Sequence, residues 1–216
     1  MPIPFIVEDT FRLNQESKAD FFDDYVVIDN FYEDIEGIQD LFKNMSVENW
    51  KGSKWSRNFK DYYDCRPIFA NNYPEYDKME ARLRPLSQLV ANMVGRDSIE
   101  IEKSLQFNIF KHIKKDVPQH KQHHPHYDTD KVNILIYIDE YANGGTALYE
   151  NKDMQNREDV NLIVDIREFD LIEVIEAKPN RCVIFNGNQL HGAWINDNKV
   201  YEDNWRITQA SIVRLW

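Results

Sequence analysis

Three residues that could bind a metal ion are the most informative feature of the sequence. His126 and Asp128 are separated by one residue, so their side chains share one face of an extended strand. Two imidazoles and one carboxylate suit a first-row divalent metal and leave coordination positions open for substrate and O2. The third ligand should come from a distant segment, and His191 is the only histidine after residue 126. Chance remains an alternative, since four of the six histidines lie between residues 120 and 126.

A second polar pair, Arg206 and Thr208, lies on the last expected strand. An arginine holds a carboxylate through two parallel hydrogen bonds, and a hydroxyl two residues along the strand can add a third. If Ile207, Val213 and Leu215 pack outward, the alternate residues Arg206, Thr208 and Ala210 face the interior. An unpaired guanidinium would be costly there, and a dianionic ligand would offset that cost. A surface arginine on an edge strand is the simpler alternative.

Hydrophobic patterns predict helices early in the chain and strands later. A β-branched strand at 25–28 precedes apolar residues at helical spacing from Ile35 to Phe42, and a second apolar stripe runs from Tyr76 to Met93. The strands expected in the second half are 99–113, 132–138, 146–149, 171–175, 182–185, 192–195 and 206–215. Many short strands separated by turns are typical of a sandwich or barrel. We therefore expect a mainly β jelly roll with the N-terminal helices packed on its outside.

Length and charge limit the class of protein. The 216 residues fit one domain, 1–216, in which 1–98 form the N-terminal strand and helices and 99–216 form the jelly-roll core. The 26 basic and 37 acidic residues give a net charge of −11, which argues against a nucleic-acid partner held by bulk electrostatics. The chain has two cysteines, no signal-peptide pattern and no long apolar run, so we expect a cytoplasmic protein without a membrane partner.

The order of these motifs resembles the order found in the Fe(II)/2-oxoglutarate-dependent dioxygenases, and within that family it is most similar to the prolyl-4-hydroxylase-like branch. The matching segments run from about residue 99 to the end of the chain. They are the strand 105–110, His126-Tyr127-Asp128, 144–149, 178–185 leading to His191, and Arg206 with Thr208. The opening strand and turn at 26–32 also resemble that branch. The resemblance rests on the order of these five segments.

The resemblance implies a double-stranded β-helix, the cupin-like form of the jelly roll. It implies that His126, Asp128 and His191 bind Fe(II). It also implies that 2-oxoglutarate chelates the iron while Arg206 holds its far carboxylate. The implied reaction uses O2, releases succinate and CO2, and hydroxylates an unactivated C–H bond of a small molecule or an amino-acid or peptide side chain. Related halogenases lack the carboxylate that Asp128 keeps, so hydroxylation or another oxidation is favoured over halogenation.

Two departures from the branch pattern bear on the cosubstrate. The branch often carries a tyrosine where Phe110 stands, and Asn108 on the same strand face is the expected substitute as a 2-oxoglutarate contact. The separation of 15 between His191 and Arg206 is long for the pattern. The polar segment 196–199 is predicted as a hairpin turn that absorbs the excess, which makes Lys199 a weaker alternative anchor.

Residues outside the core strands are candidates for contacting the substrate: Trp55, Arg57, Arg66 and His124. We expect Arg57 or Arg66 to meet a substrate carboxylate or phosphate, although core packing explains the nearby aromatic residues equally well. The competing function is a non-catalytic jelly-roll or cupin-type binding module whose histidines are structural. The sequence does not indicate an oligomeric state.

Overall fold

The computed structural model describes residues 11–44, 51–52, 62–64, 88–92, 95, 97, 106–112, 125–151, 169–201 and 204–214. The elements in chain order are β1 (Ala19–Phe21), β2 (Tyr25–Ile28), α1 (Ile35–Asn44), β3 (Lys51–Gly52), β4 (Tyr62–Asp64), β5 (Gln106–His112), β6 (Lys131–Tyr137), β7 (Gly145–Asn151), β8 (Phe169–Glu176), β9 (Arg181–Asn186), β10 (His191–Trp194), the 3-10 helix η6 (Asn198–Tyr201) and β11 (Arg206–Arg214). Residues 88–92 are also helical. None of the helices in these ranges is long and apolar enough to cross a membrane.

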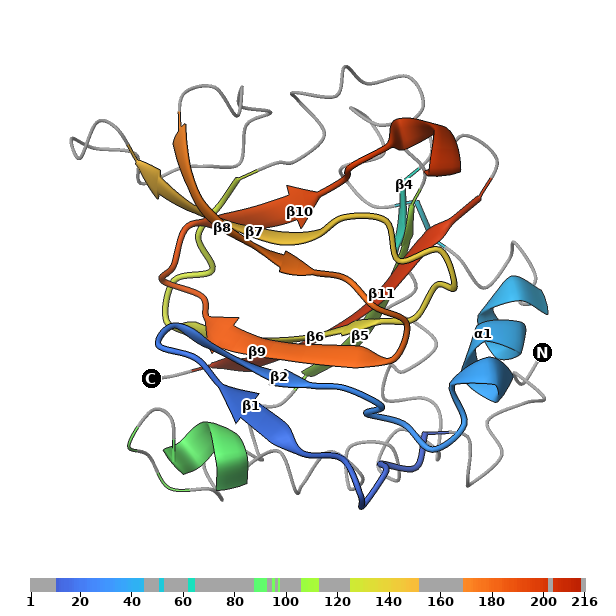
Figure 1. Cartoon of the computed structure of the whole chain (residues 1–216), viewed down its shortest axis with the longest axis horizontal. Helices are drawn as coiled ribbons and strands as arrows, with labels where there is room; N and C mark the ends of the chain where they lie inside the picture. The colour runs from blue at the N-terminus through green and yellow to red at the C-terminus, as the bar shows by residue number, and fades with distance from the viewer. Residues whose placement is uncertain are drawn as a thin grey trace.

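The described strands form two antiparallel sheets that face each other (Figure 1). The larger sheet has the order β1-β2-β9-β6-β11-β5-β4-β3, and the smaller has the order β10-β7-β8. β6 therefore lies inside the larger sheet, between β9 and β11. This is the mainly β, jelly-roll architecture expected from the strand pattern.

Apolar side chains on the outer face of the larger sheet pack against α1. Asp34 begins the helix by accepting a hydrogen bond from the Gly37 backbone N–H, with 2.8 Å between the two atoms. Ile38 and Phe42, four residues apart, are fully buried and belong to one cluster with Ile134 and Ile136 of β6. The helix predicted from the spacing of Ile35 to Phe42 is therefore confirmed, and it covers the outside of the sheet.

The inner face of the larger sheet, toward β7 and β10, carries polar groups among its apolar ones. Tyr137 packs in a second cluster with Leu148 of β7. On β11 the side chains alternate, because Ile207 and Val213 belong to the outer cluster. Arg206 and Thr208 lie on the opposite face and are buried. The expected outward packing of Ile207 and Val213 is thus confirmed, whereas Leu215 lies outside the described residues.

The segment before β11 differs from the sequence prediction. Residues 196–199 do not form a hairpin turn, because Asn198–Tyr201 form the 3-10 helix η6. Tyr201, which is 2% exposed, packs with Ile195 and donates a hydrogen bond to the buried Asp139. The polar composition of the segment indicated a turn, but the contact between Tyr201 and Asp139 joins residues 62 apart in the sequence and is not visible in it.

Candidate metal centre

His126 and His191 are brought side by side by backbone pairing. The N–H of each residue donates to the carbonyl of the other, at 2.8 Å from His126 and 3.0 Å from His191. His191 is the first residue of β10, so this bridge adds the His126 segment to the edge of the smaller sheet. The centroids of the two rings are 4.4 Å apart. A residue far along the chain thereby joins the predicted His126–Asp128 pair.

Asp128 is held by close backbone contact with Gly187, which follows β9. The Asp128 N–H donates to the Gly187 carbonyl, and the Gly187 N–H donates to the Lys131 carbonyl, both at 2.8 Å. A side chain at Gly187 would put its Cβ 2.9 Å from the Asp128 Cβ, and closer still to the Asp128 carbonyl oxygen. Only glycine therefore allows the two segments to approach in this way.

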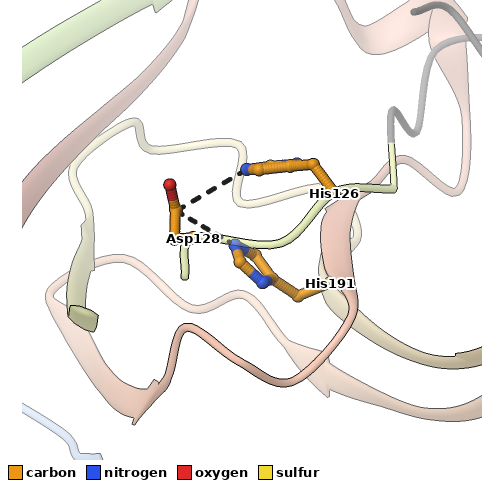
Figure 2. Close-up of side chains that lie close together, drawn as sticks. All are labelled: His126, Asp128 and His191. Atoms are coloured by element: carbon orange, nitrogen blue, oxygen red, sulfur yellow. Dashed lines mark ion pairs between the residues drawn. The ribbon is translucent and has the colours of Figure 1, made fainter. Parts of the chain in front are cut away.

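The three predicted metal-ligating side chains point toward one another (Figure 2). The Asp128 Oδ2 atom lies 3.7 Å from His126 Nε2 and 3.5 Å from His191 Nε2. All three potential ligand atoms lie within 4.8 Å of one another. His191 is buried, whereas His126 and Asp128 are partly exposed. The cluster is therefore enclosed on one side and open on the other.

The hydrogen bonds of His191 fix which ring nitrogen faces the cluster. Nδ1 lies 2.7 Å from the Gln189 carbonyl oxygen, which only accepts hydrogen bonds, so Nδ1 carries the hydrogen. The lone pair is then on Nε2, the atom that faces Asp128. The Asn133 amide donates to Asp128 Oδ2 at 3.0 Å and lies 3.3 Å from His191 Nε2. A histidine whose other N–H is held by a backbone carbonyl is the usual arrangement in metal sites.

The surroundings of Asp128 keep its carboxylate ionised. Burial raises the pKa of Asp128, but when the imidazoles are protonated the hydrogen bond from His191 and the charges of His126 and His191 outweigh that effect, with a further contribution from Asn133. The net result is a pKa well below the ordinary value. The cluster therefore offers an anionic oxygen beside imidazole nitrogens, which is a suitable ligand set for a first-row divalent cation.

Arg206 lies on the inner face, between the two sheets. Its Nη2 donates to the Gly145 carbonyl at the start of β7, at 3.1 Å, and its guanidinium carbon is 6.0 Å from the centroid of the Tyr137 ring. The Tyr137 hydroxyl shares a 2.6 Å hydrogen bond with Thr146 Oγ1. The charge of Arg206 lies near Asp139. Burial raises the pKa of Asp139 above its ordinary value, and the charge of Arg206 offsets only part of that rise. Hydroxyls and a guanidinium thus occur together on the inner face.

Not every predicted contact falls on described residues. The backbone of Asn108 pairs with that of Ala210 across β5 and β11, but its side chain lies outside the described part of the structure. The four predicted substrate contacts lie entirely outside the described residues: Trp55, Arg57, Arg66 and His124. These assignments stay predictions.

Several neighbours of the site were not predicted from the sequence: Lys131, Asn133, Tyr137, Thr146, Gly187 and Gln189. Asn133 had a usable signal, since it is the single amide in the otherwise apolar run 132–138. An amide buried within such a strand needs a hydrogen-bonding partner. Gly187 had a weaker signal as a turn glycine. Lys131 had none, because a lysine that begins a strand is ordinarily solvated.

Comparisons with known proteins extend these observations. Residues 154–207, which include His191 and Arg206, match the model of a family of unknown function, DUF6445. This match spans less than half of the chain. No curated protein matches the sequence significantly.

Solved structures with a similar fold share little sequence with the chain. The non-heme alpha ketoglutarate dependent epimerase SnoN from nogalamycin biosynthesis is 13% identical, with a TM-score of 0.52 over 89% of this chain and 77% of that one. The carbocyclase SnoK from the same biosynthesis is 11% identical, with a TM-score of 0.51 over 100% and 86%. EvdO2 from Micromonospora carbonacea var. aurantiaca, complexed with 2-oxoglutarate, is 13% identical, with a TM-score of 0.50 over 93% and 94%. The chain therefore has the jelly-roll fold of the 2-oxoglutarate-dependent oxygenases, as its motifs had indicated.

Proposed function

We propose that this chain is an Fe(II)- and 2-oxoglutarate-dependent dioxygenase in which His126, Asp128 and His191 bind the iron. The observation that carries the proposal is the convergence of three ligand atoms within 4.8 Å. The Gln189 carbonyl supports it by directing the lone pair of His191 Nε2 toward Asp128. Two imidazoles and one carboxylate are the ligand set of non-heme Fe(II) oxygenases, and they leave coordination positions open.

Arg206 is the proposed partner of the far carboxylate of 2-oxoglutarate. It is 6% exposed, and a guanidinium already removed from water favours an anionic ligand because opposite charges attract more strongly at low dielectric and form charge-assisted hydrogen bonds. Thr208, two residues along the same face of β11, is the second proposed contact. Asn108, whose backbone lies opposite Ala210, is the third.

The protein's proposed contribution is to bind and orient the reactants. The bound iron would supply the oxidation that converts 2-oxoglutarate and O2 to succinate and CO2 and oxidises the substrate. We propose hydroxylation of a C–H bond of a small molecule or an amino-acid side chain. The names of SnoN and SnoK, an epimerase and a carbocyclase, indicate that this fold also serves other outcomes. Trp55, Arg57, Arg66 and His124 remain the proposed substrate contacts.

Succinate release from 2-oxoglutarate in the presence of Fe(II) and O2 tests the proposal. The wild-type chain should release succinate slowly even without substrate. Asp128→Ala should abolish that release, because it removes the anionic ligand. Asp20→Ala, which removes an exposed carboxylate from β1, is the matched control and should leave the rate unchanged. Full activity in the Asp128→Ala variant would refute the metal assignment.

The role of Arg206 is tested by separating the cosubstrate from the metal. Arg206→Ala should raise the KM for 2-oxoglutarate about tenfold or more, because it removes charge-assisted hydrogen bonds, and should change Fe(II) affinity much less. An unchanged KM would move the anchor to another residue. A wild-type chain that binds neither Fe(II) nor 2-oxoglutarate would instead favour the non-catalytic binding module.

A further inference from the structure

The two oxygens of the Asp128 carboxylate have different neighbours. Oδ2 lies 3.5 Å from His191 Nε2 and 3.7 Å from His126 Nε2, so it belongs to the candidate metal centre. Oδ1 instead accepts a hydrogen bond from the Lys131 ammonium, with 3.1 Å between Nζ and Oδ1. The carboxylate is therefore held with one oxygen toward the imidazoles and the other toward a cation.

The backbone around Lys131 fixes this contact. The turn at 129–130, in which Asp130 has a φ of 57°, leads directly into β6, whose first residue is Lys131. Gly187 accepts from the Asp128 N–H and donates to the Lys131 carbonyl, so it holds both residues of the ion pair. The Lys131 side chain is 32% exposed, less than that of an ordinary solvated lysine.

A second side chain of the same strand face completes the arrangement. Asn133, two residues after Lys131, donates to Oδ2 at 3.0 Å. Lys131 and Asn133 thus hold one oxygen each, and the carboxylate plane cannot rotate without breaking one of the two hydrogen bonds. The orientation of Asp128 is set from β6, not only from its own segment.

We propose that Lys131 restricts Asp128 to metal binding through Oδ2 alone. This inference deepens the proposed function and rests on it. A carboxylate can bind a cation through one oxygen or both. In a six-coordinate site, two imidazoles and one oxygen leave three positions, enough for a 2-oxo acid that chelates through two atoms and for dioxygen. If Asp128 used both oxygens, only two positions would remain. 2-Oxoglutarate would then have to fill those two, whether or not they direct its far carboxylate toward Arg206, so its affinity would fall, and none would be left for dioxygen.

Lys131 should also lower the affinity of the site for the metal ion. Its ammonium places a positive charge close to the site of a divalent cation, and like charges repel. Lys131 acts through Asp128, so it is a positioning residue. Its removal should therefore move two quantities in opposite directions. The affinity for the metal should rise, and the affinity of the metal-loaded protein for 2-oxoglutarate should fall.

Two substitutions separate the hydrogen bond of Lys131 from its charge. Lys131→Met removes both, whereas Lys131→Gln removes the charge and keeps an N–H donor. Co(II) is the metal probe, measured by calorimetric titration, and 2-oxoglutarate is then titrated into the Co(II)-loaded protein. Both variants should bind Co(II) about tenfold more tightly, because the repulsion between the ammonium and the metal charge is removed. Only Lys131→Met should bind 2-oxoglutarate about tenfold more weakly.

The control variant is Lys178→Met, which removes an exposed lysine from the turn before β9 and should match the wild type in both titrations. Equal loss of 2-oxoglutarate affinity in the Met and Gln variants would overturn the inference, because charge alone would then explain it. Unchanged or weaker Co(II) binding in both variants would also overturn it. If Lys131→Met does not fold, Lys131→Ala, which removes the same hydrogen bond and charge, takes its place in both titrations. A wild type that binds no Co(II) would refute the proposed function itself.

Discussion

The two faces of β6 differ in chemistry although they belong to one strand. Its outer face consists of aliphatic residues, among them Ile134 and Ile136, which pack in the cluster under α1. Its inner face carries Lys131 and Asn133, both of which contact Asp128, and then Tyr137, which lies against Arg206. Because successive side chains of a β-strand point to opposite faces, β6 packs in the core with one face and orients a polar site with the other.

Stability and site geometry are thus carried by separate side chains of the same strand. Loss of an outer residue should weaken folding without moving the candidate metal centre. Loss of an inner residue should change ligand binding with a smaller effect on folding.

Truncation of the outer core should give the largest change in stability. Phe42 is fully buried in the outer cluster, so Phe42→Ala should lower the free energy of unfolding by about 3–5 kcal/mol. Chemical denaturation measures this loss. The Co(II) affinity of the fraction that stays folded should equal that of the wild type, and Phe42→Leu should lose less stability. A large fall in Co(II) affinity would contradict the separation of the two faces.

A side chain at Gly187 should affect the inner face. Gly187→Ala places a methyl group against the Asp128 backbone, so it should displace Asp128 and lower Co(II) affinity about tenfold or more. Titration calorimetry measures the change. The control is Gly95→Ala, where the φ of +66° also strains the backbone but no heavy atom lies within 4 Å of the added Cβ. If both variants bind Co(II) equally well, the close contact between Gly187 and Asp128 does not position the metal ligand.

The smallest expected effect on stability concerns the ion pair between Arg181, the first residue of β9, and Asp29, which directly follows β2. The two hydrogen bonds are 2.6 Å and 2.8 Å long, and the bond from Arg181 holds the pKa of Asp29 below its ordinary value of 3.8. A lowered carboxyl pKa stabilises the fold above that ordinary value, and this contribution is lost as the pH falls through the lowered pKa. Because Asp29 is 46% exposed, the contribution is about 1 kcal/mol or less.

Denaturation of Asp29→Asn against the wild type at several pH values tests this. The variant should be slightly less stable near pH 7, and the difference should shrink as the pH falls below 3.8. Added salt should shrink it as well. A difference that grows toward acid pH would contradict the assigned role of the ion pair.

The sequence predicted those features that depend on local spacing. The amphipathic pattern of α1 and the one-residue gap between His126 and Asp128 each encode a face, the apolar run 132–138 indicates a strand, and the structure has the expected elements. His191 was found because it is the one late histidine. The expected jelly roll followed from the number and order of the strands.

The features that the sequence did not predict depend on contacts between distant segments. The approach of Gly187 to Asp128 and the burial of Tyr201 against Asp139 each join residues about 60 positions apart. Lys131 was missed for another reason. Lys131 is close to Asp128 in sequence, but the direction of its side chain depends on the left-handed conformation of Asp130. The composition of the segment does not indicate that conformation.

Anaerobic titration of the Fe(II)-loaded protein with 2-oxoglutarate, followed by charge-transfer absorption, tests the central claim most directly. That band arises only when the 2-oxo acid chelates the iron. The account predicts that it appears with one equivalent of Fe(II) per chain in the wild type and is lost in His191→Ala. A wild-type chain without the band, or a His191→Ala variant that retains it in full, would contradict the claim that these three side chains form the iron site.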